Sequence, residues 1–543
     1  FLFKFIKMKK LKLVCVAIAM AGAAPTFAGG LLTNTNQHVA FNRMMSREAS
    51  IGIDGVYYNP AGVVFMGEGH HLAINWQLAY QTRTINNDYK LFTNNVNNPI
   101  TPRDFKGKAF APVIPSFQYA YNKGKWSFQA NFSLTGGGGK CTFDDGLGSF
   151  EKIVSETAIA ACGLAGVVDQ TLGNKLGQPG MEMFTSDQAF GKTGKYSFNS
   201  YMHGRQYYYG LSAGAAYKFC DNFSAFLGVR GVYALTNYYG YVENINVGNM
   251  PLYKVLDPTK ENAANIELSC DQTGVGFTPI IGVDYKTGRW NFSAKYEFKT
   301  RIRLKNKSVN QTPSIGNLPA NLANQMTGIL TARYQQAGLP LEQAKQRAEN
   351  TTNAVLNDPT VGATMMGLKT QFDQKLNKAI GEYEDGKKIA GDIPGYLALG
   401  IGYSPVDAVR VNVGFHWFDD KNATSYNNRN KELKRGTLEY NAGVEVDVNK
   451  KITLSTGWQN TNYGLSDEYM DDKSFVVGSN SAAIGGVYHI NKKMDFNVAY
   501  FHTFYQHKKT SETVQLAADK SIVYNSDYTR NNNVFAVGLD INF

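Results

Sequence analysis

The last thirteen residues, Asn531 to Phe543, read NNNVFAVGLDINF. Every second residue from Phe535 to Phe543 is apolar, and these side chains share one face of an extended strand because successive residues point to opposite sides. Such alternation is typical of the closing strand of a membrane-spanning barrel, with its apolar face toward lipid. A strand of a soluble sandwich would show the same pattern, so the rest of the chain has to decide.

Long amphipathic strands recur along the chain. Residues 126–135, 290–304, 409–417 and 494–500 alternate in the same way, and aromatic side chains lie near both ends of several apolar faces. Aromatic side chains at both interfaces of an apolar band favour lipid outside and a polar lumen inside. A membrane-embedded barrel is therefore favoured over a sandwich.

The number of strands follows from the connections. Short polar turns (NKGK, FCDN, KTGR, SPVD, VNKK and INKK) alternate with long segments, as periplasmic turns and outer loops do in outer-membrane barrels. We predict an all-β fold, a 14-stranded antiparallel transmembrane β-barrel over residues 70–543. The predicted strands are 70–83, 112–122, 125–136, 203–219, 222–239, 271–287, 289–305, 393–404, 407–420, 434–448, 451–462, 475–490, 493–508 and 530–543.

Two of the predicted outer loops, about 137–202 and 306–392, are too long to be bare coil. In the second, apolar residues recur at helical spacing, so we expect partly helical outer loops. These helices either pack on the barrel rim or also form an apolar platform where a ligand first lands. Beyond the N-terminal leader, we expect no segment of the sequence to reach the roughly eighteen apolar residues of a membrane helix. The residues at helical spacing are Leu341, Ala344, Ala348, Met365, Leu368, Phe372, Leu376, Ile380 and Tyr383.

The N-terminal residues predict export. Lysines precede a short apolar run, and Ala28 ends a small-residue cleavage site, so we expect residues 1–28 to be a signal peptide whose true start is Met8. Cleavage there would remove five lysines and no acidic residue, which lowers the formal charge from +11 to +6. This charge is too dilute over the chain to indicate a nucleic-acid partner. We expect localisation in the outer membrane of a Gram-negative cell.

Residues 29–69 precede the first strand and contain glycines and turns rather than alternation. A fourteen-stranded barrel encloses more space than its own side chains fill, so we predict that this segment is an N-terminal hatch that plugs the lumen. Within it, Asn59-Pro60 reads as a turn, because proline pushes the residue before it out of the helical region.

The stretch SREASIGIDGVYYNPAG, residues 46–62, resembles the hatch of FadL-type outer-membrane transporters of long-chain fatty acids and other hydrophobic compounds. The resemblance implies a signal peptide, a hatch with an NPA motif (here Asn59, Pro60 and Ala61) and a fourteen-stranded barrel. It implies passive transport, with capture by the outer loops, gating by the hatch and lateral exit through the barrel wall. The 306–392 loop is longer than we expect of that family.

The expected partners are a hydrophobic small molecule and outer-membrane lipid, and we expect a monomer without cofactor or metal. Two other functions stay open: a diffusion porin for polar solutes, and a surface-interaction barrel whose 306–392 loop is adhesive. We predict no enzymatic activity. GLSAG, residues 210–214, matches a serine-hydrolase pattern but lies in an alternating strand without the helix that this motif requires.

Candidate residues for binding a ligand head group are the basic residues of predicted inward faces, because arginine and lysine suit a carboxylate. They are Lys295, Lys299, Arg301, Arg303 and Arg410. Alternatively, they pair with Glu297 or Asp540 in a hydrated lumen. The run Gly136, Gly137, Gly138 and Gly139 is a candidate kink that opens the wall, or else a flexible loop entry. Cys141 and Cys162 share an outer loop and could form a disulfide, whereas we expect none with Cys220.

Overall fold

A computed structural model describes residues 31–177, 182–313, 315–517 and 520–543. One antiparallel sheet closes on itself, because β18 (Lys520–Asn542) pairs with both β16 (Met494–Tyr505) and β1 (Gly69–Asn87). The result is a closed fourteen-stranded barrel, as predicted. The predicted signal peptide lies outside the described residues.

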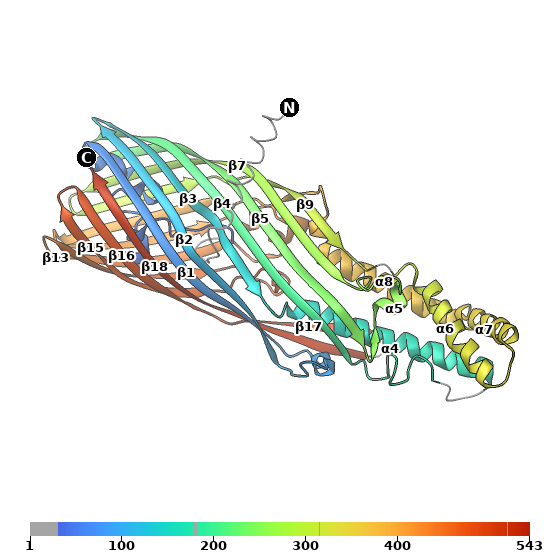
Figure 1. The fold of residues 1–543 in the computed structure, drawn as a ribbon. Coiled ribbons are helices and arrows are strands. Elements are labelled where there is room, and N and C mark those ends of the chain that lie inside the picture. The colour runs from blue at the N-terminus through green and yellow to red at the C-terminus, as the bar shows by residue number, and fades with distance from the viewer. Residues whose placement is uncertain (1–30, 178–181, 314, 518–519) are drawn as a thin grey trace, which may run out of the picture.

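The wall strands follow one another in chain order around the barrel (Figure 1). One wall position is shared by two successive strands, β8 and β9, which are separated by a break. After β1 the wall consists of β2 (Arg103–Lys123), β3 (Trp126–Phe143), β4 (Tyr196–Cys220), β5 (Phe223–Val247), β7 (Ile266–Thr287), β8 (Trp290–Glu297) with β9 (Arg303–Gln311), β11 (Tyr396–Val406), β12 (Val409–Phe418), β13 (Thr437–Asn449), β14 (Ile452–Asn462), β15 (Ser479–Asn491), β16 and β18.

Several strands run further than predicted beyond the long-loop end. β4 and β5 each have 25 residues. Of residues 509–529, predicted as a loop, the described parts 509–517 and 520–529 pair as β17 (Lys508–Ala517) and the first part of β18. The short strands β6 (Met250–Pro251) and β10 (Lys388–Ala390) pair with β5 and β9. Beyond the lipid layer the outward face of a strand can be polar, so the apolar outward face that marks a membrane strand is not required in these extensions.

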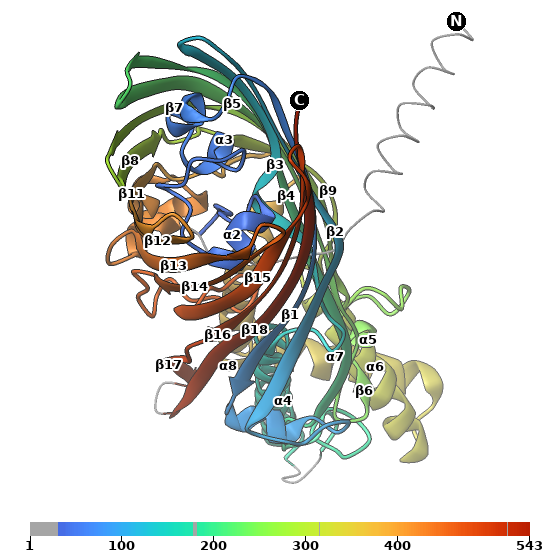
Figure 2. The same cartoon turned by 90° about the vertical axis from the view of Figure 1, so that its left-hand side faces the viewer.

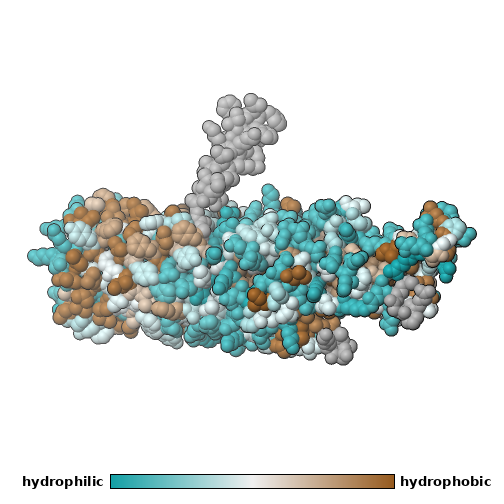
Figure 3. Space-filling view, turned by 60° about the horizontal axis from the view of Figure 1, so that its bottom comes forward, coloured by the Kyte–Doolittle hydropathy of each residue, from teal (hydrophilic) through white to brown (hydrophobic). Residues whose placement is uncertain are grey.

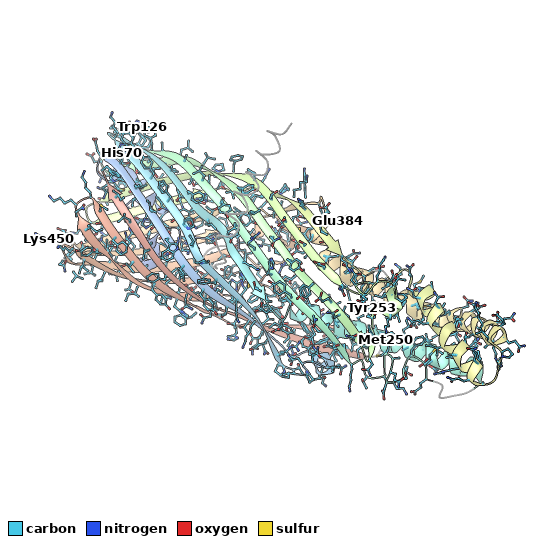
Figure 4. All side chains as sticks on the ribbon, in the orientation of Figure 1. His70, Trp126, Met250, Tyr253, Glu384 and Lys450 are labelled. Carbon is cyan, nitrogen blue, oxygen red and sulfur yellow. The ribbon has the colours of Figure 1, made fainter. Side chains whose placement is uncertain are left out.

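The outside of the barrel is apolar toward the short-turn end. Trp76, Trp126, Trp290 and Trp458 are among its exposed residues, and Figure 3 shows the brown apolar surface concentrated there. Figure 4 labels His70, Trp126 and Lys450 at this end, and Met250, Tyr253 and Glu384 away from it. An exposed apolar surface of this extent with aromatic residues is what a membrane-spanning barrel presents to lipid.

Helices form an elongated cap at the long-loop end (Figure 1). α7 and α8 contain the residues predicted at helical spacing, except Tyr383, which ends the 3-10 helix η3 (Gly381–Tyr383). The cap consists of α4 (Gly148–Leu176), α5 (Tyr253–Leu256), α6 (Leu318–Gln336), α7 (Leu341–Leu356) and α8 (Pro359–Ile380). Shorter 3-10 turns are η2 (Lys90–Asn94), η4 (Asp420–Asn422) and η5 (Tyr426–Glu432).

Among the described residues, α4 alone is long and apolar enough to cross a membrane by length and composition. The sequence-based expectation that no such segment exists was therefore wrong. The helix lies between β3 and β4 in the cap and packs its apolar residues, Val168 and Leu172 among them, into the cap's core. Its composition is explained by this burial.

The first described residues, 31–68, lie inside the barrel. They form α2 (Val39–Met44), α3 (Gly55–Tyr58) and the 3-10 helix η1 (Gly62–Phe65), and Figure 2 shows α2 and α3 surrounded by the strands. Residues 33–49 are buried throughout. We call residues 31–68 the hatch segment. Because so many polar side chains are enclosed here, their hydrogen bonds to the wall determine how the segment is held.

A candidate transport site between the hatch and the wall

The triplet Asn59-Pro60-Ala61 joins the hatch segment to three strands. The side-chain nitrogen of Asn59, Nδ2, donates to Oδ2 of Asp284 on β7 at 2.5 Å. The next two carbonyl oxygens accept hydrogen bonds, Pro60 from Gln129 on β3 and Ala61 from Ser224 on β5, each at 2.7 Å. Asn59 also ends α3, where its backbone N–H still donates to Gly55 and Pro60 prevents continuation. The triplet is thus a triple anchor on the wall.

Ion pairs on the opposite side of the lumen tie the hatch segment to β12 and β13. Glu48 accepts from Nε2 of His416 at 2.8 Å, and Nδ1 of His416 contacts Glu439 at 2.9 Å. All three side chains are fully or almost fully buried. Arg43 pairs with Glu445 and donates to Ser455 at 2.9 Å. Buried charges of this kind are held only when each has its partner.

A further ion pair stiffens the hatch segment itself. Nε of Arg47 lies 2.6 Å from Oδ2 of Asp54, and its second nitrogen donates to Oδ1 at 3.1 Å. Burial acts to raise the pKa of Asp54, but the charge of Arg47 prevails and the pKa stays below its ordinary value. The bidentate ion pair between Arg47 and Asp54 therefore holds the two ends of residues 47–54 together.

The predicted head-group residues separate into two sets. Lys295 and Arg410 face the lumen, as expected, but carboxylates already neutralise them: Lys295 lies 2.9 Å from Glu297, and Arg410 lies 2.7 Å from Glu445 and also pairs with Asp447. Lys295 also donates to the carbonyl oxygen of Tyr57 in α3 at 2.6 Å. The alternative of pairing with Glu297 therefore holds for Lys295.

The prediction that Arg301 and Arg303 face the lumen is wrong. Ile302 and Leu304 are buried, whereas both arginines are exposed outside. Glu297 and Thr300, three residues apart, both point inward, so the break between β8 and β9 inverts the alternation. Lys299 lies in the break and donates to the carbonyl oxygen of Asn422 at 3.0 Å.

Sequence reasoning missed one buried basic residue of the lumen, Arg230 on β5. Its guanidinium donates twice to Glu297, at 2.5 and 2.9 Å, and lies 5.5 Å from the ring centre of Tyr57. The sequence does contain one indication of its importance: Arg230 is the one basic residue in the predicted strand 222–239. Its partner, Glu297, stands 67 residues away and could not be read from the sequence.

Pairing between β2 and β3 is interrupted. The register joins residues 107–109 to 141–143 and residues 117–123 to 126–132, with no pairs between. The candidate kink, Gly136 to Gly139, lies in β3 opposite this interruption, and β3 bulges there against β4. Gly137 and Gly139 have φ values of +66° and +127°, which a side chain would strain. The glycine run is thus within the wall.

The hatch segment spans the interruption from inside. Gln37 donates through Nε2 to the carbonyl oxygen of Leu134 on β3 at 2.7 Å. Its own carbonyl oxygen accepts from Ser116 and Gln118 on β2, at 2.6 and 2.9 Å. Asn34 adds a bond to the carbonyl oxygen of Gly137 at 2.8 Å. The polar hatch residues thus replace part of the missing strand pairing.

An apolar cluster extends from the lumen to the interrupted pairing of β2 and β3. Met45 of the hatch segment and Phe501 of β16 are packed in one cluster with Ile114, Leu134 and Tyr207 from beside the interruption. All five are nearly fully buried. A hydrophobic molecule in the lumen would therefore find apolar surface toward the interruption rather than toward the ion pairs.

The cap contains an apolar cavity of about 120 Å³. Its walls come from α4, α5, α6 and α8, with Leu164, Leu252 and Phe372 among the lining residues. Lys375 stands at its margin, where its ammonium group pairs with Glu156. An apolar cavity of about 150 Å³ is large enough to hold benzene, so this one suits a single ring or a stretch of alkyl chain.

A second cavity, of about 890 Å³, lies at the short-turn end and is lined by many charged side chains. Arg43, Arg410, Glu445 and Asp447 line it together with the turns at Lys450 and Lys492. The two cavities therefore differ in chemistry, apolar in the cap and charged at the opposite end.

The four described cysteines, Cys141, Cys162, Cys220 and Cys270, are free thiols in the structure. Cys141 and Cys270 are buried, and Cys220 is exposed at the β4–β5 turn. Among the described residues, no group of three or more His, Cys, Asp or Glu side chains is arranged to hold a metal ion.

These features define a class, a closed fourteen-stranded barrel whose lumen holds an N-terminal hatch. The fold is that of FadL-type channels: a FadL homologue from Pseudomonas aeruginosa is similar with a TM-score of 0.57 at 14% identity, covering 95% of this chain and 100% of that one. No protein-family model matches the sequence, and no curated protein matches it significantly.

Two toluene transporters resemble the chain more loosely. TbuX of Ralstonia pickettii has a TM-score of 0.45 at 13% identity, and TodX of Pseudomonas putida has 0.47 at 11% identity. In both cases the match covers 91% of this chain and 94% of the other.

Proposed function

We propose that this chain is an outer-membrane channel for the passive import of hydrophobic small molecules, with long-chain fatty acids as its first cargo. The observation that carries the proposal is the position of Gln37, which bridges β2 and β3 where their pairing is interrupted. The route has three stages: capture in the cap, passage along the hatch, and lateral exit through the wall.

Capture takes place in the apolar cavity of the cap. Its lining is almost entirely aliphatic and aromatic, and Lys375 provides one cation at its margin. A fatty acid would lay part of its chain among these residues and exchange its carboxylate for that of Glu156, the present partner of Lys375. Lys295 and Arg410 are weaker candidates, because a ligand would have to displace Glu297 or Glu445 from buried pairs.

Exit takes place at the interruption between β2 and β3. The hatch contacts of Gln37 and Asn34 are neutral hydrogen bonds, each worth only about 1 kcal/mol net. A ligand that gains apolar contact with Ile114 and Leu134 can offset their loss. The Asn59-Pro60-Ala61 anchor, which contacts β3, β5 and β7 close to their short turns, would hold the rest of the segment while Asn34 to Gln37 move.

The filled lumen argues against a diffusion porin. α2 and α3 occupy it, and the ion pairs of Arg43 and Glu48 fix the hatch segment to the wall. A polar solute would need these pairs to open, whereas a hydrophobic molecule can follow the apolar cluster.

The test is uptake by cells that lack their own transporter, with radiolabelled oleate, toluene and glucose offered separately. The intact chain is compared with Ala161→Trp, which fills the cap cavity, and with Ile114→Trp/Leu134→Trp, which blocks the interruption. We expect both variants to lose most oleate uptake. The matched control for the cavity is Ala363→Trp, an exposed position on α8.

The control for the wall is Leu211→Trp, an exposed position on β4. Surface amounts are matched by labelling of the folded barrel. Glucose uptake by the intact chain would replace the proposal by a porin. Normal oleate uptake by Ile114→Trp/Leu134→Trp would be compatible with a channel but would contradict lateral exit between β2 and β3. Uptake of toluene without uptake of oleate by the intact chain would contradict only the proposed cargo.

A further inference from the structure

The outer face of β9 carries a row of cations. Arg301, which lies just before the strand, and Arg303, Lys305 and Lys307 within it are exposed, while the residues between them are buried. Because alternate residues of a strand point to opposite sides, all four side chains leave the barrel on the same face. The buried intervening residues are Ile302, Leu304 and Asn306.

The neighbouring short strand adds a fifth cation. Lys388 of β10 stands directly opposite Lys305 in the register, and it too is exposed. Ile389, opposite Leu304, is buried, which fixes Lys388 on the outer face. Like charges directly opposite each other destabilise a strand pair unless an anion lies between them. We call Arg301, Arg303, Lys305, Lys307 and Lys388 the basic strip.

Few carboxylates compensate this charge. Asp392 pairs with Arg303 at 2.8 Å, and Asp271 stands opposite Lys307 but already accepts from Asn237 at 2.8 Å. Among the residues that the structure describes, none forms a hydrogen bond or ion pair with the other four side chains, those of Arg301, Lys305, Lys307 and Lys388. Asp385 also lies at this edge, where it accepts from the backbone N–H of Ser308 at 2.8 Å. Three carboxylates thus stand near five cations, and the strip keeps a net positive charge that an external anion would neutralise.

The position of the strip indicates which anion. On the same outer wall, Trp290, Phe292 and Phe298 of the β8 region are 44%, 38% and 43% exposed. At about 3.3 Å per residue and a strand tilt of about 40°, Trp290 to Phe298 rises roughly 20 Å, which is most of an apolar belt of about 25 Å. The basic strip begins three residues beyond Phe298, toward the long-loop end. Its cations are therefore at the level of lipid head groups, immediately above the acyl chains.

We propose that the basic strip binds the phosphate groups of a phosphorylated glycolipid of the outer leaflet. Arginine binds phosphate through paired hydrogen bonds, and lysine contributes point charges, so the strip offers both kinds of contact. Clustered cations next to a membrane surface recognise anionic head groups in this way. The adjoining apolar belt favours a lipid over a free phosphate ion, since acyl chains would lie on Phe292 and Phe298 while the head group lies on the strip.

The test uses the full chain purified in maltoside micelles and titrated with lipid A, a bis-phosphorylated glycolipid, or with the same lipid after enzymatic removal of its phosphates. We expect the intact chain to bind the phosphorylated form at least tenfold more tightly. Lys305→Gln/Lys307→Gln/Lys388→Gln should reduce this preference to less than twofold, and the arginine triple variant at the same positions should retain it.

The matched control is Lys254→Gln/Lys345→Gln/Lys369→Gln, which removes the same charge from α5, α7 and α8 in the cap. It should behave like the intact chain. Folding of every variant is checked by the faster migration of the unheated barrel in electrophoresis. An unchanged preference in the strip variant, or a preference lost equally in the cap variant, would overturn the proposal. Inorganic phosphate that binds as tightly as the glycolipid would overturn the choice of a lipid.

Discussion

The side-chain amide of Gln37 donates a hydrogen bond to the carbonyl oxygen of Leu134 at 2.7 Å, across 97 residues of sequence. Leu134 belongs to β3 at the point where β3 has lost its pairing with β2, so this carbonyl faces the hatch. The carbonyl oxygen of Gln37 meanwhile accepts from Ser116 of β2. One hatch residue thus takes the place of a cross-strand pair.

Removal of this bridge should loosen the hatch without unfolding the barrel. Gln37→Ala deletes the bond to Leu134 and one to Asn34, and each is worth about 1 kcal/mol. We expect a barrel of near-normal stability whose ion conductance in planar bilayers rises and fluctuates, because water can enter beside β2 and β3. Gln335→Ala, at an exposed position of α6, is the control and should leave the conductance unchanged. A Gln37→Ala channel as silent as the intact one would show that the bridge does not seal the wall.

Gly136 should be intolerant of a side chain for a reason unrelated to its φ angle. A Cβ atom there would lie 2.1 Å from the carbonyl oxygen of Leu32, a backbone atom that cannot rotate away. We expect Gly136→Ala to displace the start of the hatch segment at a cost of about 1–3 kcal/mol, comparable to overpacking elsewhere. Limited proteolysis near residue 32 and the urea midpoint of unfolding measure the two effects.

Gly166 of α4 offers the matched control, since nothing lies within 4 Å of a Cβ placed there. Gly166→Ala should leave stability unchanged or raise it by up to about 1 kcal/mol, because alanine favours a helix. If both alanines have the same effect, the close approach of Leu32 to the wall is not a determinant of hatch position.

The sequence was sufficient to predict the barrel because lipid imposes alternation on every wall strand. Each of the fourteen predicted strands falls on one wall position of the barrel, and the six short turns lie where turn residues predicted them. Prediction from alternation fails where strands extend beyond the lipid layer. The paired strands within residues 509–529 were not recognised because they lie beyond the apolar belt. The prediction also fails at residues 298–302, where a break inverts the faces and moves Arg301 and Arg303 outside.

The candidate site was less predictable for a different reason. The triplet Asn59-Pro60-Ala61 could be noticed as a turn, but its partners Gln129, Ser224 and Asp284 are scattered over three strands. Polar residues of the lumen form hydrogen bonds with residues that are close in space but distant in the sequence. The periodicity of a single sequence does not reveal which residues these are. Only the spacing along each strand, not the neighbour across the lumen, is available before the fold is known.

His416 should be the most sensitive residue of the hatch–wall contact. His416→Ala would leave Glu48 and Glu439 buried next to each other without a cation, and breaking a buried pair costs about 3–5 kcal/mol. We expect a large fall in the urea concentration at which the unheated barrel loses its fast electrophoretic mobility.

His507 provides the comparison. Its side chain is 63% exposed and pairs with Asp527 at 3.1 Å, so His507→Ala should cost less than about 1 kcal/mol. The triple variant Glu48→Gln/His416→Gln/Glu439→Gln removes all charge and should recover part of the stability lost in His416→Ala. A His416→Ala barrel as stable as the His507→Ala barrel would mean that the buried carboxylates find other partners.

Asp420 should make the contact between the hatch and the long-loop end depend on pH. It lies in η4, outside the membrane-spanning strands, and accepts hydrogen bonds from the N–H groups of Leu31 at 3.1 Å and Thr437 at 2.8 Å. Burial raises the pKa of its carboxyl group from 3.8 to about 6, although these hydrogen bonds act in the opposite direction. The folded chain therefore binds this proton more tightly than the unfolded chain does.

The sign of the dependence follows from that difference. Asp420 contributes its full stabilisation below about pH 4, and this contribution is lost as the pH rises through about 6. Hydrogen-exchange protection factors of residues 419–437, corrected for intrinsic exchange, should accordingly fall between pH 5 and pH 7.5. Asp420→Asn keeps an oxygen acceptor for Leu31 or Thr437 but cannot ionise, so its protection should hardly change over the same interval. Equal pH dependence in the two proteins would assign the effect to another group, because the asparagine side chain, in which an NH2 group replaces one carboxylate oxygen, cannot ionise in this range.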